Sequence, residues 1–145
     1  MNFPETLIES VGFVLSKLAQ RVIRLAEAKM AALGIQTKHV GVLATIVERG
    51  PLSQKAIGEA LLIDRTTMVQ LADKLESLGL VERRPDPVDR RVSLLHLTAD
   101  GETAYRRARS LVRDAEAHLL DCLAPEERAK LHRLLVRVLE QEQEG

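Results

Sequence analysis

Residues 80–97 interrupt a chain that is otherwise patterned for helices. Pro85 and Pro87 stand close together there, and each forbids a continuing helix. The flanking segments, 80–84 and 91–97, are typical of short strands. We therefore expect one β-hairpin, with its tight loop at the prolines, inside a mainly α-helical fold.

The remaining segments repeat apolar residues at steps of three and four, the period of amphipathic helices. Helices are expected at 5–33, at 37–49 with Thr37 as cap, at 54–61 after Ser53, at 65–78 after Asp64, from 98 or 100 to 122, and from Pro125 onward. The two short helices joined by Leu62 and Ile63 form a helix-turn-helix candidate. The apolar surface of the helix at 5–33 is wide enough to pack against two neighbours, one in the same chain and one in another chain.

Length and charge narrow the class of protein. The chain has 145 residues, about one domain, and 21 basic against 21 acidic residues give a formal net charge of zero. A sequence-indifferent nucleic-acid coat would show a basic excess. The longest uncharged stretch, 39–47, is too short for a membrane span, and the first ten residues lack the pattern of a secretory signal. A cytoplasmic protein without membrane partners is the expectation.

The helix at 65–78 offers a polar face that fits a major groove. Met68, Leu71, Ala72 and Leu75 are expected inside, which turns outward Arg65, Thr66, Val69, Gln70, Asp73 and Lys74. Gln pairs with adenine through two hydrogen bonds, while Thr and Val methyl groups suit the thymine methyl. The alternative is a plain solvated helix face.

Four arginines surround the turn of the hairpin: Arg83, Arg84, Arg90 and Arg91. Such an arm can reach phosphates or a narrow minor groove, where the potential is most negative. Asp86 and Asp89 would then hold neighbouring guanidinium groups in a fixed direction. The alternative is a surface salt-bridge network of little energetic consequence.

These elements together resemble the MarR family of bacterial transcription regulators. The resemblance rests on the runs 50–57, 63–67, 75–83, 86–91 and 97–101, and above all on Gly-Leu-Val-x-Arg, Asp-x-x-Asp-Arg-Arg and Leu-Thr-x-x-Gly. It covers about residues 34–101, and the flanking helices fit the family in number and order. It implies a winged helix-turn-helix homodimer that binds duplex DNA, with a dimerisation helix at 1–33, a DNA-binding lobe at 34–99 and dimerisation helices at 100–145, interlocked as one domain.

The resemblance also implies site residues. The helix at 65–78 would enter the major groove, and the hairpin, which is the wing of this fold, would reach the adjacent minor groove. The start of the helix at 54–61 would lie near a phosphate. The expected DNA contacts are Ser53, Gln54, Lys55, Arg65, Thr66, Thr67, Val69, Gln70, Lys74, Arg84, Asp89, Arg90 and Arg91. The expected dimer contacts are Leu7, Val11, Leu15, Leu111, Leu119, Leu131, Leu135 and Val138. A two-fold dimer would read a pseudo-palindrome with half-sites about one helical turn apart.

One pair of residues departs from the family pattern. Many members have a hydroxyl residue and an arginine where this chain has Val69 and Gln70. The loss of a guanidinium that could pair with guanine means that no operator sequence carries over. We expect Gln70 to bias that position toward adenine.

The family is commonly released from DNA by small phenolic or anionic ligands, or by cysteine oxidation. The sequence identifies no effector, no cofactor and no metal site. Cys122 follows Leu119 by three residues and is expected as a buried thiol, with a redox role as the alternative; His118 and Cys122 alone are too few for a metal. No enzyme motif is present. A rival interpretation is a dimeric ligand-binding or protein-interaction module on this fold that does not bind DNA.

Overall fold

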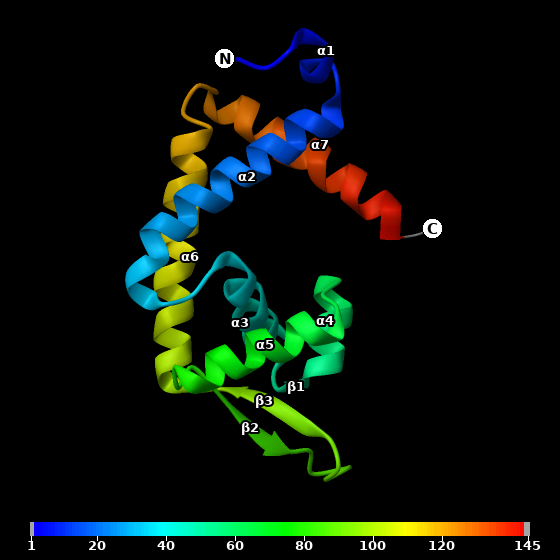
Figure 1. Cartoon of the computed structure of the whole chain (residues 1–145), viewed down its shortest axis with the longest axis vertical. Coiled ribbons are helices and arrows are strands. Elements are labelled where there is room, and N and C mark those ends of the chain that lie inside the picture. The colour runs from blue at the N-terminus through cyan, green and yellow to red at the C-terminus, as the bar shows by residue number, and fades with distance from the viewer. Residues whose placement is uncertain (1, 144–145) are drawn as a thin grey trace.

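The computed structural model describes residues 2–143. Its elements are α1 (Glu5–Ile8), α2 (Val11–Met30), η1 (Ala31–Leu33), α3 (Thr37–Arg49), β1 (Leu52–Ser53), α4 (Gln54–Leu61), α5 (Arg65–Ser77), β2 (Val81–Pro85), β3 (Ser93–Leu97), α6 (Ala99–Leu119) and α7 (Pro125–Gln143). Figure 1 shows a lobe made of α3 to β3, from which the long helices α2 and α6 rise. The mainly α-helical, winged helix-turn-helix prediction is confirmed.

The two helices of the helix-turn-helix, α4 and α5, begin at the caps predicted from the sequence, Ser53 and Asp64. The Ser53 hydroxyl accepts a hydrogen bond from the Ala56 N–H (3.1 Å) at the start of α4. Asp64 accepts one from the Thr67 N–H (2.9 Å) at the start of α5. These bonds satisfy amide groups that have no partner within the helix. The turn between the helices places Leu62 in the left-handed region, with φ at 54°.

The wing is β2, β3 and the loop 86–92 between them. The strands pair antiparallel with Val81 opposite Leu97 and Pro85 opposite Ser93, so the predicted hairpin is confirmed. The structure adds a strand that the sequence did not predict, because β1 pairs with β3 through Leu52 opposite Leu95. The sheet order is therefore β1-β3-β2, and the third strand attaches the wing to the segment that leads into α4.

The Leu-Thr-x-x-Gly motif joins the wing to α6. The Thr98 side chain caps α6 by accepting from the Gly101 N–H (3.0 Å) and donates to the Gly79 carbonyl (2.6 Å). The Thr98 N–H donates to the Leu80 carbonyl (3.1 Å). A Cβ at Gly101 would stand 1.9 Å from that same carbonyl oxygen, so no side chain fits there.

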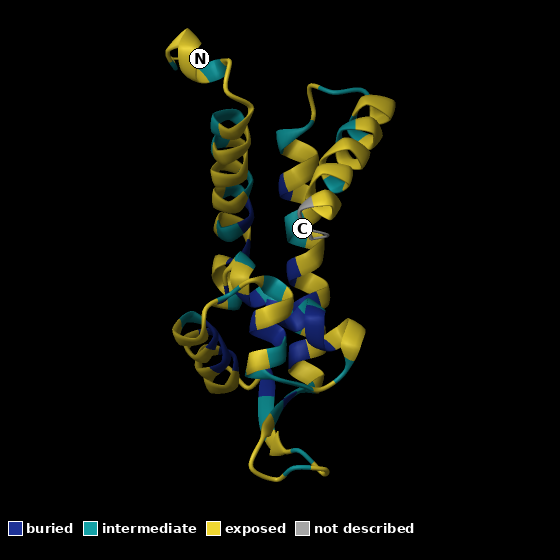
Figure 2. Cartoon of the chain, turned by 90° about the vertical axis from the view of Figure 1, so that its right-hand side faces the viewer, coloured by how far each residue is buried: buried dark blue, intermediate teal, exposed yellow. Residues whose placement is uncertain are grey.

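The core is concentrated in the lobe. Figure 2 shows the buried residues there, while the upper parts of the long helices are mostly exposed. The predicted inner face of α5 is confirmed, since all four of its residues are buried. The largest fully buried side chains are Met30, Leu43, Ile57, Met68, Leu75, Leu95, Val42 and Val81.

Two sequence predictions for the first half of the chain are wrong. The expected helix at 5–33 is broken after Ile8, because the Ser10 hydroxyl caps a new helix through the Phe13 N–H (3.3 Å). Thr37 does not cap α3, since Gln36 holds that position. The Gln36 N–H donates to Nδ1 of His39 (2.9 Å), while the Thr37 hydroxyl and amide bond Glu27 instead.

The expected burial of Cys122 is also wrong. Helix α6 ends at Leu119, and Cys122 lies exposed in the turn that leads to α7. The apolar face of α6 therefore ends at Leu119 and does not continue to Cys122, although the spacing had indicated that it would. His118 therefore lies in α6 and Cys122 outside it, so the two residues are not one helical turn apart on a shared helix.

Within residues 2–143, no single helix is long and apolar enough to cross a membrane. The stretches Val11–Leu33 and Thr37–Arg49 meet the length and composition requirements when taken together, but they are bent by 76° relative to each other.

Candidate nucleic-acid interface

Helix α5 presents the polar face that the sequence predicted. Arg65, Thr66, Val69 and Gln70 are all exposed. Opposite them the buried side chains of α5 fix the rotation of the helix in the lobe. The outward direction of these four residues is therefore confirmed, and their contact with DNA stays a prediction.

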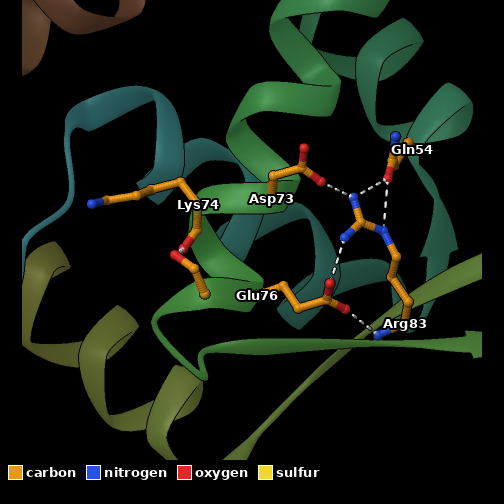
Figure 3. Close-up of polar contacts among 6 residues, drawn as sticks. Gln54, Asp73, Lys74, Glu76 and Arg83 are labelled. Atoms are coloured by element: carbon orange, nitrogen blue, oxygen red, sulfur yellow. Dashed lines mark hydrogen bonds and ion pairs between the residues drawn. The ribbon is translucent and has the colours of Figure 1, made fainter.

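Two further residues of α5, Thr67 and Lys74, were predicted to contact DNA, and of these only Lys74 is exposed. Thr67 is half-buried, and its hydroxyl donates to the Asp64 carboxylate (2.7 Å) as part of the helix cap. The hydrogen bonds from the Thr67 amide and hydroxyl lower the pKa of Asp64 below its usual value. Lys74 is exposed and extends away from the neighbouring carboxylate of Asp73 (Figure 3).

The start of α4 brings together Ser53, Gln54 and Lys55. Ser53 is half-buried and uses its hydroxyl as the helix cap. Gln54 is half-buried, and its carbonyl oxygen accepts two hydrogen bonds from the Arg83 guanidinium. Lys55 is exposed. The amide groups and the lysine give this helix start a positive character that suits a phosphate.

The loop of the wing is organised by its two aspartates. The Asp86 carboxylate accepts from the Val88 N–H (2.9 Å), and the Asp86 N–H donates to the Val92 carbonyl (2.8 Å). Asp89 accepts from Arg91 three times, from its backbone N–H (3.1 Å), from Nε (3.0 Å) and from Nη2 (3.1 Å). The predicted use of a carboxylate to direct a guanidinium is confirmed for Asp89, whereas Asp86 shapes the backbone.

The same contact shifts the pKa values of its two partners. The side-chain and backbone hydrogen bonds from Arg91 lower the pKa of Asp89, and the hydrogen bonds to Asp89 raise the pKa of Arg91. Both groups are therefore charged at neutral pH. The Arg91 side chain is nonetheless 91% exposed, so its outer face is free to meet another anion.

The four arginines of the wing divide into two kinds. Arg84 is exposed and pairs with Glu82 on the same strand, and Arg90 is exposed at the loop. Together with Arg91 they face solvent. Arg83 differs, because its side chain is only 24% exposed and turns back toward α5.

Arg83 joins three elements by one guanidinium (Figure 3). Nη1 bonds Glu76 (2.7 Å), Nη2 bonds Asp73 (2.6 Å), and Nε and Nη2 bond the Gln54 carbonyl oxygen (3.1 and 2.8 Å). Burial alone would lower the pKa of Arg83, but the hydrogen bonds to Asp73 and Glu76 outweigh it and raise the pKa. Sequence reasoning grouped Arg83 with the solvent-facing arginines and missed this arrangement. The available signal was the pair of carboxylates at Asp73 and Glu76, one helical turn apart and just before the strand.

The predicted dimer contacts lie outside the lobe on α1, α2, α6 and α7. In the single chain Leu111, Leu119 and Leu131 are half-buried, whereas the others are exposed: Leu7, Val11, Leu15, Leu135 and Val138. Val11 is 73% and Val138 60% exposed. None of the residues 125–141 of α7 is buried. Apolar side chains left uncovered on these helices favour contact with a partner, and this supports the predicted dimer interface without testing it.

Hollows of the described surface include one at the helix-turn-helix and one between α2 and α6. One, of about 410 Å³, lies at the helix-turn-helix and is lined by Lys38, Gly41, Leu61, Leu62, Ile63, Asp64 and Thr67. The other, of about 300 Å³, lies between α2 and α6 and is lined by Arg21, Arg24, Leu25, His118 and Leu119. Residues 2–143 contain no cluster of three or more His, Cys, Asp or Glu side chains arranged to hold a metal ion.

Comparison with known proteins places this geometry in a family. The sequence pattern described as "MarR family" matches residues 33–92. A putative transcriptional regulatory protein for the hcr operon of Thauera aromatica is 33% identical over 111 residues, which is 77% of this chain and 67% of that protein.

Solved structures agree with the sequence comparison. A mutant of MarR from Escherichia coli, complexed with operator DNA, has a TM-score of 0.79 and 29% identity, covering 89% of this chain and 93% of that one. PcaV from Streptomyces coelicolor, in complex with its natural ligand, has a TM-score of 0.79 and 28% identity, covering 97% and 98% of the two chains.

Proposed function

The chain belongs to the MarR family of transcriptional regulators, and we propose that it acts as a ligand-responsive repressor, a homodimer bound to a pseudo-palindromic operator. The observation that carries the proposal is that one lobe exposes both the polar face of α5 and the Arg91 side chain of the wing to solvent. A helix and an arm so placed suit a major groove and the neighbouring minor groove. Its family comprises regulators, not enzymes.

The dimer is proposed from the uncovered apolar residues of α1, α2 and α7. Leu15 and Leu135 are each 41% exposed in the single chain, and Val138 more so. A two-fold dimer would present two copies of α5 to one face of a duplex, with half-sites about one helical turn apart. A DNA-bound regulator of this kind would work in the cytoplasm.

The effector is proposed to be a small anionic or phenolic molecule, bound in the hollow between α2 and α6. Arg21 and Arg24 line that hollow beside Leu25 and Leu119, so the two guanidinium groups offer positive charge next to apolar surface. PcaV, a protein of the same fold, is described with its natural ligand bound. Release from DNA requires that the ligand prefer a conformation in which the two α5 helices are wrongly spaced. No cofactor is part of the proposal.

The proposal is tested by the geometry of the bound duplex. A duplex selected by this protein from a random library should bind two chains, as measured by the mass of the complex. Binding should be lost when half a helical turn of base pairs is inserted between the two half-sites of that duplex. Equal binding to both spacings would contradict the two-fold dimer. For the effector, benzoate is the probe: it should weaken DNA binding by the unaltered protein and not by the Arg24→Ala variant.

A further inference from the structure

Arg83 stands where the three DNA-facing parts of the lobe meet. Its backbone belongs to β2 of the wing, and its N–H also bonds Glu76 (3.2 Å). Its guanidinium reaches α5 through Asp73 and Glu76, and the first residue of α4 through Gln54. One side chain thus links the wing, the recognition helix α5 and the start of the preceding helix α4 (Figure 3).

The contact with Gln54 fixes the orientation of an amide. A guanidinium has only donors, so the oxygen and not the nitrogen of the Gln54 amide must face it. Both Nε and Nη2 of Arg83 meet that oxygen, at 3.1 and 2.8 Å. In Figure 3 the amide nitrogen of Gln54 is accordingly turned away from Arg83. The amide nitrogen of Gln54 is thus held on the side away from Arg83, where it can donate to another group.

The contacts with Asp73 and Glu76 change the charge of the recognition helix. Asp73 is exposed, three residues after Gln70 and four after Val69, so it shares their face of α5. A free carboxylate there would repel phosphate. The guanidinium pairs with it at 2.6 Å and with Glu76 at 2.7 Å. The carboxylates are 61% and 43% exposed, so these ion pairs contribute little to stability and their effect is mainly on direction and charge.

We propose that Arg83 is a positioning residue for DNA binding, one that does not contact DNA but holds the Gln54 amide as a donor to a phosphate oxygen. The inference rests on the proposed function. It separates Arg83 from Arg84, Arg90 and Arg91, which face solvent. Because phosphates carry no base identity, the effect of Arg83 extends to duplexes of any sequence.

The test is a double-mutant cycle on DNA affinity, with Gln54→Met, Arg83→Lys and the two combined. Lysine keeps the charge but cannot make the fork, and methionine keeps the length of Gln54 but has neither amide group. A duplex selected from a random library and an unrelated duplex at low salt are the two probes. We expect each single change to weaken binding about fivefold, the effect of one hydrogen bond. Arg83→Lys should add less than about twofold when Gln54 is already methionine.

Arg84→Lys is the matched control, since Arg84 is the next residue and its ion pair is with Glu82. Its effect should be the same with Gln54 or with methionine at that position. An equal loss from Arg83→Lys in both backgrounds, or no loss at all, would overturn the positioning role. Thermal unfolding of each variant separates affinity from stability, because an Arg83 needed only for folding would lower the melting temperature and leave the affinity of the folded protein unchanged.

Nuclear magnetic resonance on the unaltered protein gives an independent reading. On addition of duplex, the side-chain amide protons of Gln54 should shift, while the Nε proton of Arg83 keeps its hydrogen-bonded position. The reverse pattern would mean that Arg83 itself turns to the DNA. If the unaltered protein binds no duplex, the proposed function falls with this inference; if it binds and the cycle is additive, this inference alone is overturned.

Discussion

The guanidinium of Arg91 and the carboxylate of Asp89, two residues earlier on the wing, share two hydrogen bonds, Nε to Oδ1 at 3.0 Å and Nη2 to Oδ2 at 3.1 Å. Asp89 also accepts from the Arg91 N–H at 3.1 Å. An acidic residue on a DNA-binding arm would ordinarily weaken binding. Here it fixes the direction of the cation beside it.

Removal of Asp89 is expected to weaken DNA binding although it removes a negative charge. Asp89→Ala frees the Arg91 side chain, which must then be ordered when DNA binds. We expect a loss of about three- to tenfold in affinity, which is about 0.6–1.4 kcal/mol and typical of one ordinary hydrogen bond. Titration of the selected duplex measures it. Tighter binding by Asp89→Ala would show that the carboxylate acts only as a repelling charge.

Removal of Arg90 or Arg91 should have a different signature. Each change to alanine is expected to weaken binding roughly tenfold and to lower the slope of log affinity against log salt by about one. The dimer should be unaffected because the wing lies away from α1, α2 and α7 (Figure 1). An unchanged salt slope would rule out a phosphate contact by that residue.

Gln70 is expected to read adenine. Its side chain is exposed on α5, and its amide can pair with N6 and N7 of adenine by two hydrogen bonds. Replacement of that base by guanine should cost about 1–3 kcal/mol, and Gln70→Arg should reverse the preference. Competition between duplexes that differ at one base pair measures both. Equal binding of the adenine and guanine duplexes by the unaltered protein would refute the assignment.

The buried His39 is expected to make stability depend on pH. Burial, and next the positive charge of Lys74, lower the pKa of His39 in the folded protein below its ordinary value of about 6.5. The unfolded chain therefore takes up the proton first. The free energy of unfolding should hold its full value above about pH 6.5 and decline as the pH falls through the lowered, folded-state pKa.

His39→Gln is the control for that decline. Glutamine at this position can still accept from the Gln36 N–H, which now bonds Nδ1 of His39 at 2.9 Å, and it does not titrate. Denaturant unfolding from pH 7.5 to pH 5 should show a smaller loss for the variant than for the unaltered chain. Identical curves for the two proteins would assign the pH dependence to other groups.

Gly101 is expected to tolerate no side chain. A Cβ there would stand 1.9 Å from the Leu80 carbonyl oxygen, so Gly101→Ala must move the start of α6 or the turn beneath it. We expect a loss of about 1–3 kcal/mol in unfolding free energy. Gly12→Ala is the matched control, because its nearest contact would be the Ser10 hydroxyl at 3.9 Å and alanine favours the helix. Equal stability of the two variants would contradict the clash.

The dimer is expected to depend on α7. Val138→Asp and Leu135→Asp place a charge on side chains that are exposed in the single chain but would be covered by a second one. Both should shift the protein toward monomers in sedimentation at micromolar concentration. Val88→Asp is the control, since Val88 is 94% exposed on the wing and its change should leave the dimer intact. Unchanged dimers in the α7 variants would place the interface elsewhere.

The sequence predicted the features that depend on neighbouring residues. Caps at Ser53 and Asp64 are side-chain bonds to amides three residues on, and residue type and spacing predicted both. The same signals left the start of α6 open between Thr98 and Asp100, and they favoured Thr37 where Gln36 is the cap of α3. The hairpin likewise follows from Pro85 and Pro87, which exclude a helix.

Features that depend on distant residues were missed. Strand β1 forms because Leu52 meets Leu95, far along the chain, and its two residues carry no strand pattern of their own. Arg83 meets Gln54 across 29 positions for the same reason. The end of α6 before Cys122 was missed because the apolar spacing continued past the last helical turn.

DNA recognition is tested most directly by selection from a random duplex library, followed by titration of the selected site at several salt concentrations. The proposed dimer predicts an enriched pseudo-palindrome with half-sites about one helical turn apart, bound more weakly as salt rises. Failure to enrich any sequence at low salt would contradict DNA recognition by this lobe. It would favour instead a dimeric module that binds small molecules or proteins on the same fold.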